Sequence, residues 1–132
     1  MDIKEKINYW IEIALDDLDS ADIMLKKKKY LQSGFYCHQS VEKILKGYFW
    51  FIKQEDPPFT HNLLKLSKES GIDNLIDDTQ KKLLDLLMPL NIEARYPDEK
   101  MRVMKTLDNS KAERIYKETE EIVTWIHKLI TQ

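Results

Sequence analysis

Strong backbone breakers are scarce in this chain, which has three glycines and four prolines among 132 residues. Gly and Pro together make up about 12% of an ordinary sequence, so an average chain of this length carries about twice as many. All-β sandwiches and barrels need turns rich in these residues at roughly every tenth position. The chain cannot supply such turns, and its length fits one domain, residues 1–132.

Apolar residues recur at steps of three and four along most of the chain, which is typical of helices with one buried face. The expected helices span about 2–28, 31–53, 60–71, 73–90 and 108–130. Asp2 and Thr60 are the expected N-caps of the first and third helices, because their side-chain oxygens accept from free backbone N–H groups. Stripes of this kind must be buried on one another, so we expect an all-α fold, an up-and-down antiparallel bundle of four to five helices.

The stretch from Asn91 to Leu107 shows no clean apolar period, and we expect a loop there. Long loops in compact domains are often functional. The loop carries Arg95 beside Tyr96, a pair that can bind a phosphate and stack on a base. The alternative interpretation is that Arg95 pairs with Asp98 or Glu42 and only holds the loop in place.

Charge and cysteine content limit the ligands and the cellular compartment that we expect for the protein. The 21 basic and 23 acidic residues give a formal net charge of −2, so nucleic-acid binding would depend on a local patch. The single Cys37 cannot form an intramolecular disulfide, which fits a reducing cytoplasm. The most apolar stretch, Tyr48 to Ile52, is far too short to span a bilayer, and no membrane partner is expected.

Metal and nucleophile motifs have little support. Di-iron bundles need Glu-x-x-His pairs, which this chain lacks, and a single cysteine gives no zinc spacing. His38 and Glu42 are four residues apart, and we interpret them as a hydrogen-bonded polar pair rather than as metal ligands. No nucleophile elbow or phosphate-binding glycine loop is present, so no catalytic residue, metal or cofactor is assigned.

Four short motifs are spread over nearly the whole chain. They are Trp10 with Ala14-x-x-Asp17-Leu18-x-x-Ala21, Phe35-x-x-His38-Gln39-Ser40-Val41-Glu42-Lys43-Ile44-Leu45-Lys46, Thr60-His61-Asn62-Leu63 and Arg95-Tyr96-Pro97-Asp98. In this order they resemble the first helix, the second-helix signature, the start of the third helix and the Arg-Tyr-Pro loop of HEPN domains (higher eukaryotes and prokaryotes nucleotide-binding). The chain is most similar to the small stand-alone prokaryotic members of that family.

The resemblance implies a helical bundle that commonly forms a homodimer. It also implies frequent pairing with a minimal nucleotidyltransferase, often as a toxin–antitoxin-like pair. Many members of the family are metal-independent ribonucleases, in which an Arg is followed by a His after four to six residues. Here Arg95, Arg102 and Arg114 have no His at that distance.

Our leading hypothesis is therefore a non-enzymatic binding and partner module. Its cleft would bind a nucleotide, RNA or another phosphate-bearing ligand through Gln39, Glu42, Lys43, Lys46, His61, Arg95 and Tyr96. In this hypothesis the cations neutralise phosphate, Gln39 and Glu42 supply hydrogen bonds, and Tyr96 offers a stacking face.

Two other functions stay open. One is a ribonuclease toxin that uses Arg95 together with His61 or His38. The other is a structural homodimeric adaptor, in which these polar residues only satisfy one another.

Overall fold

The computed structural model describes residues 1–91 and 97–132. These residues form six α-helices and two short 3-10 helices, with no strand among them: α1 (Ile3–Lys26), α2 (Tyr30–Lys53), α3 (Leu63–Ser70), η1 (Ile72–Asn74), α4 (Asp78–Leu87), η2 (Met88–Leu90), α5 (Pro97–Thr106) and α6 (Asn109–Thr131). The predicted all-α fold is confirmed. None of the helices in the described ranges is long and apolar enough to cross a membrane.

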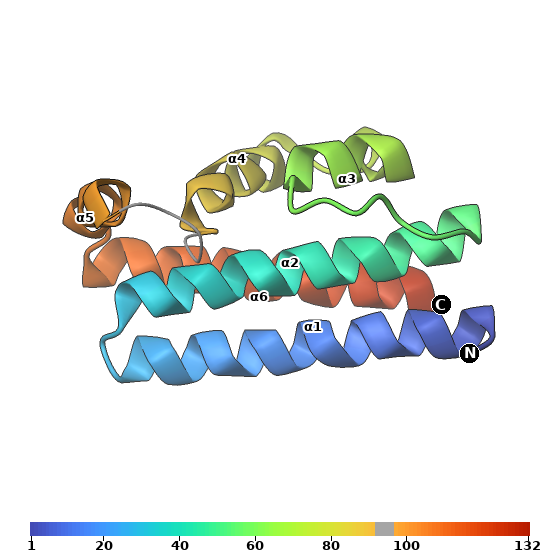
Figure 1. Ribbon diagram of the computed structural model, residues 1–132, viewed down its shortest axis with the longest axis horizontal. Helices are drawn as coiled ribbons and strands as arrows, with labels where there is room; N and C mark the ends of the chain where they lie inside the picture. The colour runs from blue at the N-terminus through green and yellow to red at the C-terminus, as the bar shows by residue number, and fades with distance from the viewer. Residues whose placement is uncertain (92–96) are drawn as a thin grey trace.

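Helices α1 and α2 form a long antiparallel hairpin, and α6 lies along both of them (Figure 1). Helix α6 runs in the same direction as α2, because α3, α4 and α5 first return the chain to the end of the bundle where α2 begins (Figure 1). Helices α3 and α4 lie on the side of α2 that faces away from α1 (Figure 1). This arrangement places α2 at the centre, with neighbours on several sides.

The N-caps explain where the helices begin. The Asp2 side chain accepts from the third backbone N–H of α1 at 2.7 Å, as predicted, and Asp108 caps α6 in the same way at 2.8 Å. The predicted cap of α3 is wrong. Asn62 takes that position and accepts a backbone N–H at 3.0 Å, whereas the Thr60 hydroxyl accepts from the backbone N–H of Asn62.

Two other segments differ from the prediction. Helix α4 begins at Asp78 rather than near residue 73, because Asp77 and Gln80 form a capping box there and the short η1 comes before it. Residues 97–106 form the helix α5 where a loop was expected. Helix α5 has no buried residue, so its sequence carries no apolar stripe to reveal it.

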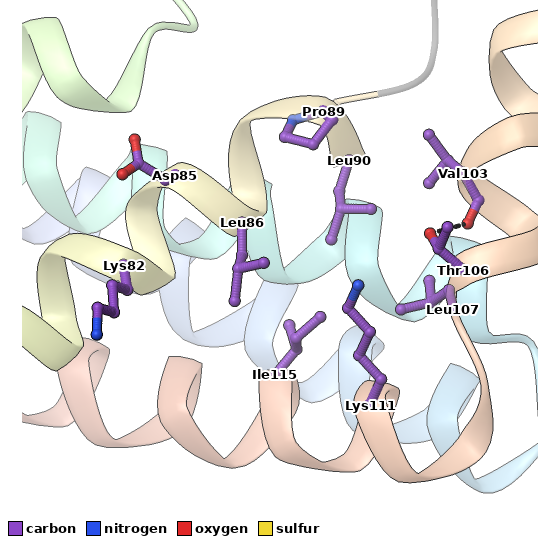
Figure 2. Close-up of a pocket in the computed structure, with 10 residues that line it drawn as sticks. All are labelled: Lys82, Asp85, Leu86, Pro89, Leu90, Val103, Thr106, Leu107, Lys111 and Ile115. Atoms are coloured by element: carbon purple, nitrogen blue, oxygen red, sulfur yellow. Dashed lines mark hydrogen bonds between the residues drawn. The ribbon is translucent and has the colours of Figure 1, made fainter.

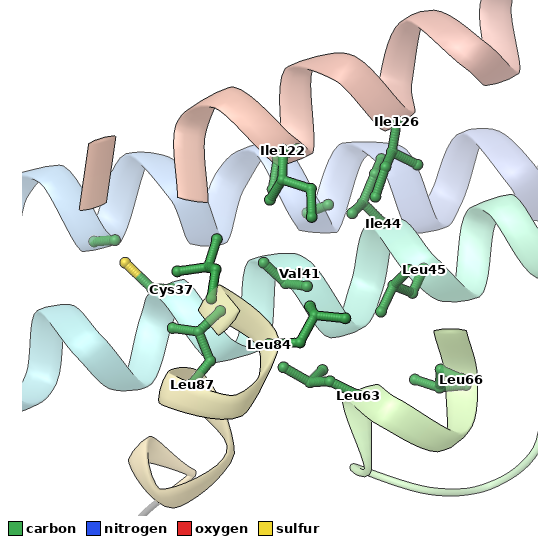
Figure 3. Packing of buried hydrophobic residues seen from close by; sticks show 14 of the residues in the cluster. Cys37, Val41, Ile44, Leu45, Leu63, Leu66, Leu84, Leu87, Ile122 and Ile126 are labelled. Atoms are coloured by element: carbon green, nitrogen blue, oxygen red, sulfur yellow. The ribbon is translucent and has the colours of Figure 1, made fainter. Parts of the chain in front are cut away.

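The core lies where α2 meets α3, α4 and α6 (Figure 3). Aliphatic side chains from all four helices interdigitate there, together with one cysteine: Cys37, Val41, Ile44, Leu45, Leu63, Leu66, Leu84, Leu87, Ile122 and Ile126. All ten are at most 1% exposed. Burying an aliphatic side chain of this size contributes roughly 1.5–3 kcal/mol, so this contact area holds the short helices against α2.

Small residues bring α1 close to α2. Ala14 and Ala21 of α1 are fully buried, and the hydroxyls of Ser40 and Ser33 donate to their carbonyl oxygens at 2.7 and 2.9 Å. These two buried hydrogen bonds fix the register of the hairpin. The register in turn decides which side chains of α1 stand beside the polar residues of α2.

Candidate functional site

The segment between α2 and α3 brings His61 back to the middle of α2. Helix α2 ends where Gln54 adopts a left-handed conformation with a φ of 57°. Pro57 and Pro58 cannot continue a helix, and the segment returns along α2 to reach α3 (Figure 1). His61 thereby lies against Glu42, a residue 19 positions earlier in the chain.

The buried carboxylate of Glu42 is the centre of the site. The residue is only 1% exposed, and it accepts a hydrogen bond from the Lys46 ammonium at 3.0 Å. Nδ1 of His61 lies 3.0 and 3.1 Å from its two oxygens. Since a carboxylate only accepts, Nδ1 carries the proton and donates it, which leaves Nε2 of a neutral ring as an acceptor. The His61 side chain is 63% exposed, so this second nitrogen faces solvent.

Lys46 is occupied by this arrangement. Its side chain is 9% exposed, and its ammonium also lies 5.4 Å from the centre of the Trp10 ring on α1. An ammonium over an aromatic face is stabilised by the ring quadrupole. Lys46 therefore holds the Glu42 carboxylate from inside the protein.

Lys43 and Gln39 extend the network along α2. The Lys43 ammonium donates to Gln39 at 2.6 Å and lies 3.9 Å from Glu42. Gln39 donates to the side-chain oxygen of Asn91 at 3.3 Å. Burial raises the pKa of Asp17 on α1, while the nearby Lys43 opposes that rise. Lys43 keeps 19% of its side chain exposed and is the more accessible cation.

The structure thus joins five of the predicted ligand residues in one connected network: Gln39, Glu42, Lys43, Lys46 and His61. The two others, Arg95 and Tyr96, lie outside the described residues. Asn91, the last described residue before that gap, is itself a member of the network.

His38 lies under the network and is 1% exposed. Its Nδ1 is 3.9 Å from a Glu42 oxygen and has no hydrogen-bond partner, so the predicted hydrogen-bonded His38–Glu42 pair is wrong. Burial lowers the pKa of His38 to about 4, and the ring is neutral at neutral pH. Within residues 1–91 and 97–132, no group of three or more His, Cys, Asp or Glu is placed to hold a metal ion.

Phe59 is a feature that sequence reasoning missed. The backbone N–H of Thr60 donates to the carbonyl of Pro58 at 2.9 Å, which closes a three-residue turn with Phe59 at its centre. The Phe59 ring is fully exposed, at 102% of its reference area, and it stands two residues before His61. The two prolines in front of an aromatic residue were the available signal of a stiff, protruding turn.

Comparison with known proteins agrees with this architecture. TT1696 from Thermus thermophilus has a similar structure, with a TM-score of 0.77 at 21% identity over 93% of this chain and 97% of that one. ST0689, an archaeal HEPN homologue, has a TM-score of 0.65 at 18% identity over 94% of this chain and 97% of that one. No curated protein matches the chain. At these identities the two structures support the fold alone, whereas the HEPN domain model matches residues 7–129. The chain therefore belongs to the HEPN domain family.

Proposed function

We propose that this HEPN domain is a binding module whose site around His61 takes a nucleotide or another phosphate-bearing ligand. The observation that carries the proposal is the Glu42–His61 pair, in which a buried carboxylate orients an exposed imidazole. When the ring is protonated, Nε2 donates to a phosphate oxygen while Glu42 stabilises the positive charge from beneath. Charge-assisted hydrogen bonds of this kind are about twice as strong as neutral ones.

The residues around His61 have separate roles in this proposal. Lys43 is the accessible second cation for a phosphate, whereas Lys46 keeps the Glu42 carboxylate in place. The exposed ring of Phe59 offers a stacking face for a base, and such stacking contributes roughly 1–3 kcal/mol per base. Arg95 and Tyr96 remain proposed ligand residues, since the chain enters their segment from the network at Asn91.

Calorimetric titration tests this proposal. ATP, AMP and inorganic phosphate are titrated into the wild-type protein and into the His61→Gln, Lys43→Met and Arg95→Ala variants. We expect each substitution to weaken nucleotide binding about tenfold, the loss of one charge-assisted hydrogen bond. His127→Gln on α6 is the matched control and should bind as the wild type does. The absence of heat with every nucleotide would contradict the proposal.

A ribonuclease is the second candidate function, and the same pair favours it. A carboxylate that holds the Nδ1 proton of a histidine leaves Nε2 able to accept a proton from a hydroxyl, as in hydrolases that use an oriented imidazole. His61 is the exposed histidine of the cluster, since His38 is buried. Incubation with total RNA checks this function. Cleavage that persists in His61→Ala would exclude His61 as the catalytic base.

Partners form the last part of the proposal, and family membership supports them. The domain forms a homodimer and works with a minimal nucleotidyltransferase in a toxin–antitoxin-like pair, in a cytoplasm where the free, buried Cys37 stays reduced. Co-expression with the neighbouring reading frame, followed by co-purification and a mass measurement, tests it. If neither nucleotide binding nor RNA cleavage is found, a homodimeric adaptor remains as the function.

A further inference from the structure

A cavity of about 440 Å³ lies among α4, η2, α5 and α6 (Figure 2). Its apolar lining comes from these elements and from the residue that links α5 to α6: Leu86, Leu90, Val103, Leu107 and Ile115. Small-molecule sites in proteins have volumes of roughly 300–1,000 Å³ and predominantly apolar walls. No lining residue of this cavity belongs to the Glu42–His61 network.

Three charged residues in the described part of the chain line the cavity, and they differ in where their charged ends point. Among the residues that the structure describes, Lys82 of α4 and Lys111 of α6 line it together with one acidic residue, Asp85. Figure 2 shows the Lys111 side chain extending from α6 towards Leu90, whereas the charged ends of Lys82 and Asp85 both point away from the cavity. Neither lysine forms an ion pair with any residue in the described part of the chain. The cavity is therefore apolar, and the Lys111 ammonium extends into it.

Lys111 occupies a position that α6 alone would not favour. It is the third residue of the helix, and its backbone N–H donates to the Asp108 cap. A cation there opposes the positive end of the helix dipole, and glutamate is the residue that completes a capping box at this position. The Lys111 residue is partly buried and forms no ion pair with the described residues. A local rule broken without a compensating contact is typical of a functional position.

We propose that this cavity is a binding site for a small organic anion with an apolar body, of the chemical class of medium-chain carboxylates. The chain of the ligand fills the space between Leu86, Leu90 and Val103, and its carboxylate lies at the Lys111 ammonium. The Thr106 hydroxyl already donates to the Val103 carbonyl at 2.9 Å, so Lys111 and not this hydroxyl selects the anion.

Calorimetric titration of decanoate into the full chain tests the site, with decylammonium as a probe of equal length and opposite charge. We expect one decanoate per chain and at least tenfold weaker binding of decylammonium. Shortening the carboxylate by one carbon should weaken binding roughly fourfold, the effect of one buried methylene. Equal binding of both probes would overturn the proposal, because it would indicate an apolar surface without selection for charge.

Two variants at position 111 distinguish specific binding in the cavity from non-specific hydrophobic binding. Lys111→Met keeps the length of the side chain and should lose the preference for decanoate. Lys111→Glu should reverse that preference towards decylammonium, and the capping box that it completes with Asp108 favours the folded helix. Lys128→Met, a change at a lysine near the far end of the same helix, is the control and should bind as the wild type does. Unaltered decanoate binding in Lys111→Glu would refute the site.

Discussion

Replacing Glu42 by Gln removes one charge from the interior and leaves the Lys46 ammonium without its counter-ion. Both side chains are at most 9% exposed, so water cannot take the place of the lost partner. Removing one partner of a buried ion pair costs about 3 kcal/mol or more of folding free energy. The amide oxygen introduced by Glu42→Gln still accepts one hydrogen bond, so we expect the loss in this variant to be about 3 kcal/mol. For a chain of 132 residues, an unfolding entropy of about 2.1 cal/mol/K per residue converts this loss into a fall in Tm of about 11 °C.

Thermal and urea unfolding of Glu42→Gln, Lys46→Met and the double variant measures the coupling. We expect the double variant to lose clearly less stability than the sum of the two single losses, since it leaves no unpaired charge inside. The exposed Lys26–Asp22 pair is a matched control, with the same spacing and an N–O distance of 2.9 Å against 3.0 Å. Asp22→Asn should cost less than about 1 kcal/mol. Strict additivity of the two single losses, or equal losses in Glu42→Gln and Asp22→Asn, would refute the reasoning.

Two further predictions concern stability. Burial lowers the His38 pKa from 6.5 to about 4, so as the pH falls the unfolded chain gains a proton at His38 that the folded chain does not take up. Urea unfolding should therefore show a stability loss of about 1.4 kcal/mol between about pH 7.5 and 5.5, and His38→Gln should show a shallower pH dependence; parallel curves would exclude His38 as the cause. Asp77→Ala removes the capping box of α4 and should cost about 1 kcal/mol in thermal unfolding, whereas Asp78→Ala should cost only a few tenths; equal losses would contradict the assigned cap.

Helices that bury a stripe could be predicted from the sequence, and α5 could not. The apolar steps of α1 and α6 place their ends within two residues, because tertiary packing is what creates the period. Helix α5 buries no residue, so its sequence has no periodic apolar stripe that would predict a helix. Its remaining signals were Pro97 at the first position and the acidic Asp98 and Glu99 in the first turn, which are typical of a helix start.

The sequence predicts which residues of the candidate site are neighbours, but it does not predict which of their charges are buried. A helical wheel places Glu42 beside Lys46 at the border of the apolar arc, and this predicts neighbours but not burial. The burial of Glu42 also depends on the path of residues 54–62, which sets His61 against the carboxylate. No helical period encodes that path, so the deep position of Lys46 and the exposed, oriented His61 required three-dimensional structure.

Helix α5 also has a consequence for the order in which the molecule opens. Its contacts with the core go through the partly buried Val103, so its backbone amides should exchange with deuterated solvent long before those of α2. Local opening of α5 removes one wall of the cavity that Lys111 enters, while the core around Ile44 stays closed. A ligand that binds only to the closed state lowers the population of the open state by a factor of one plus the ratio of the free ligand concentration to Kd, and amide exchange through that state falls with it. Amide exchange along residues 97–106 would then act as a gauge of what the cavity holds.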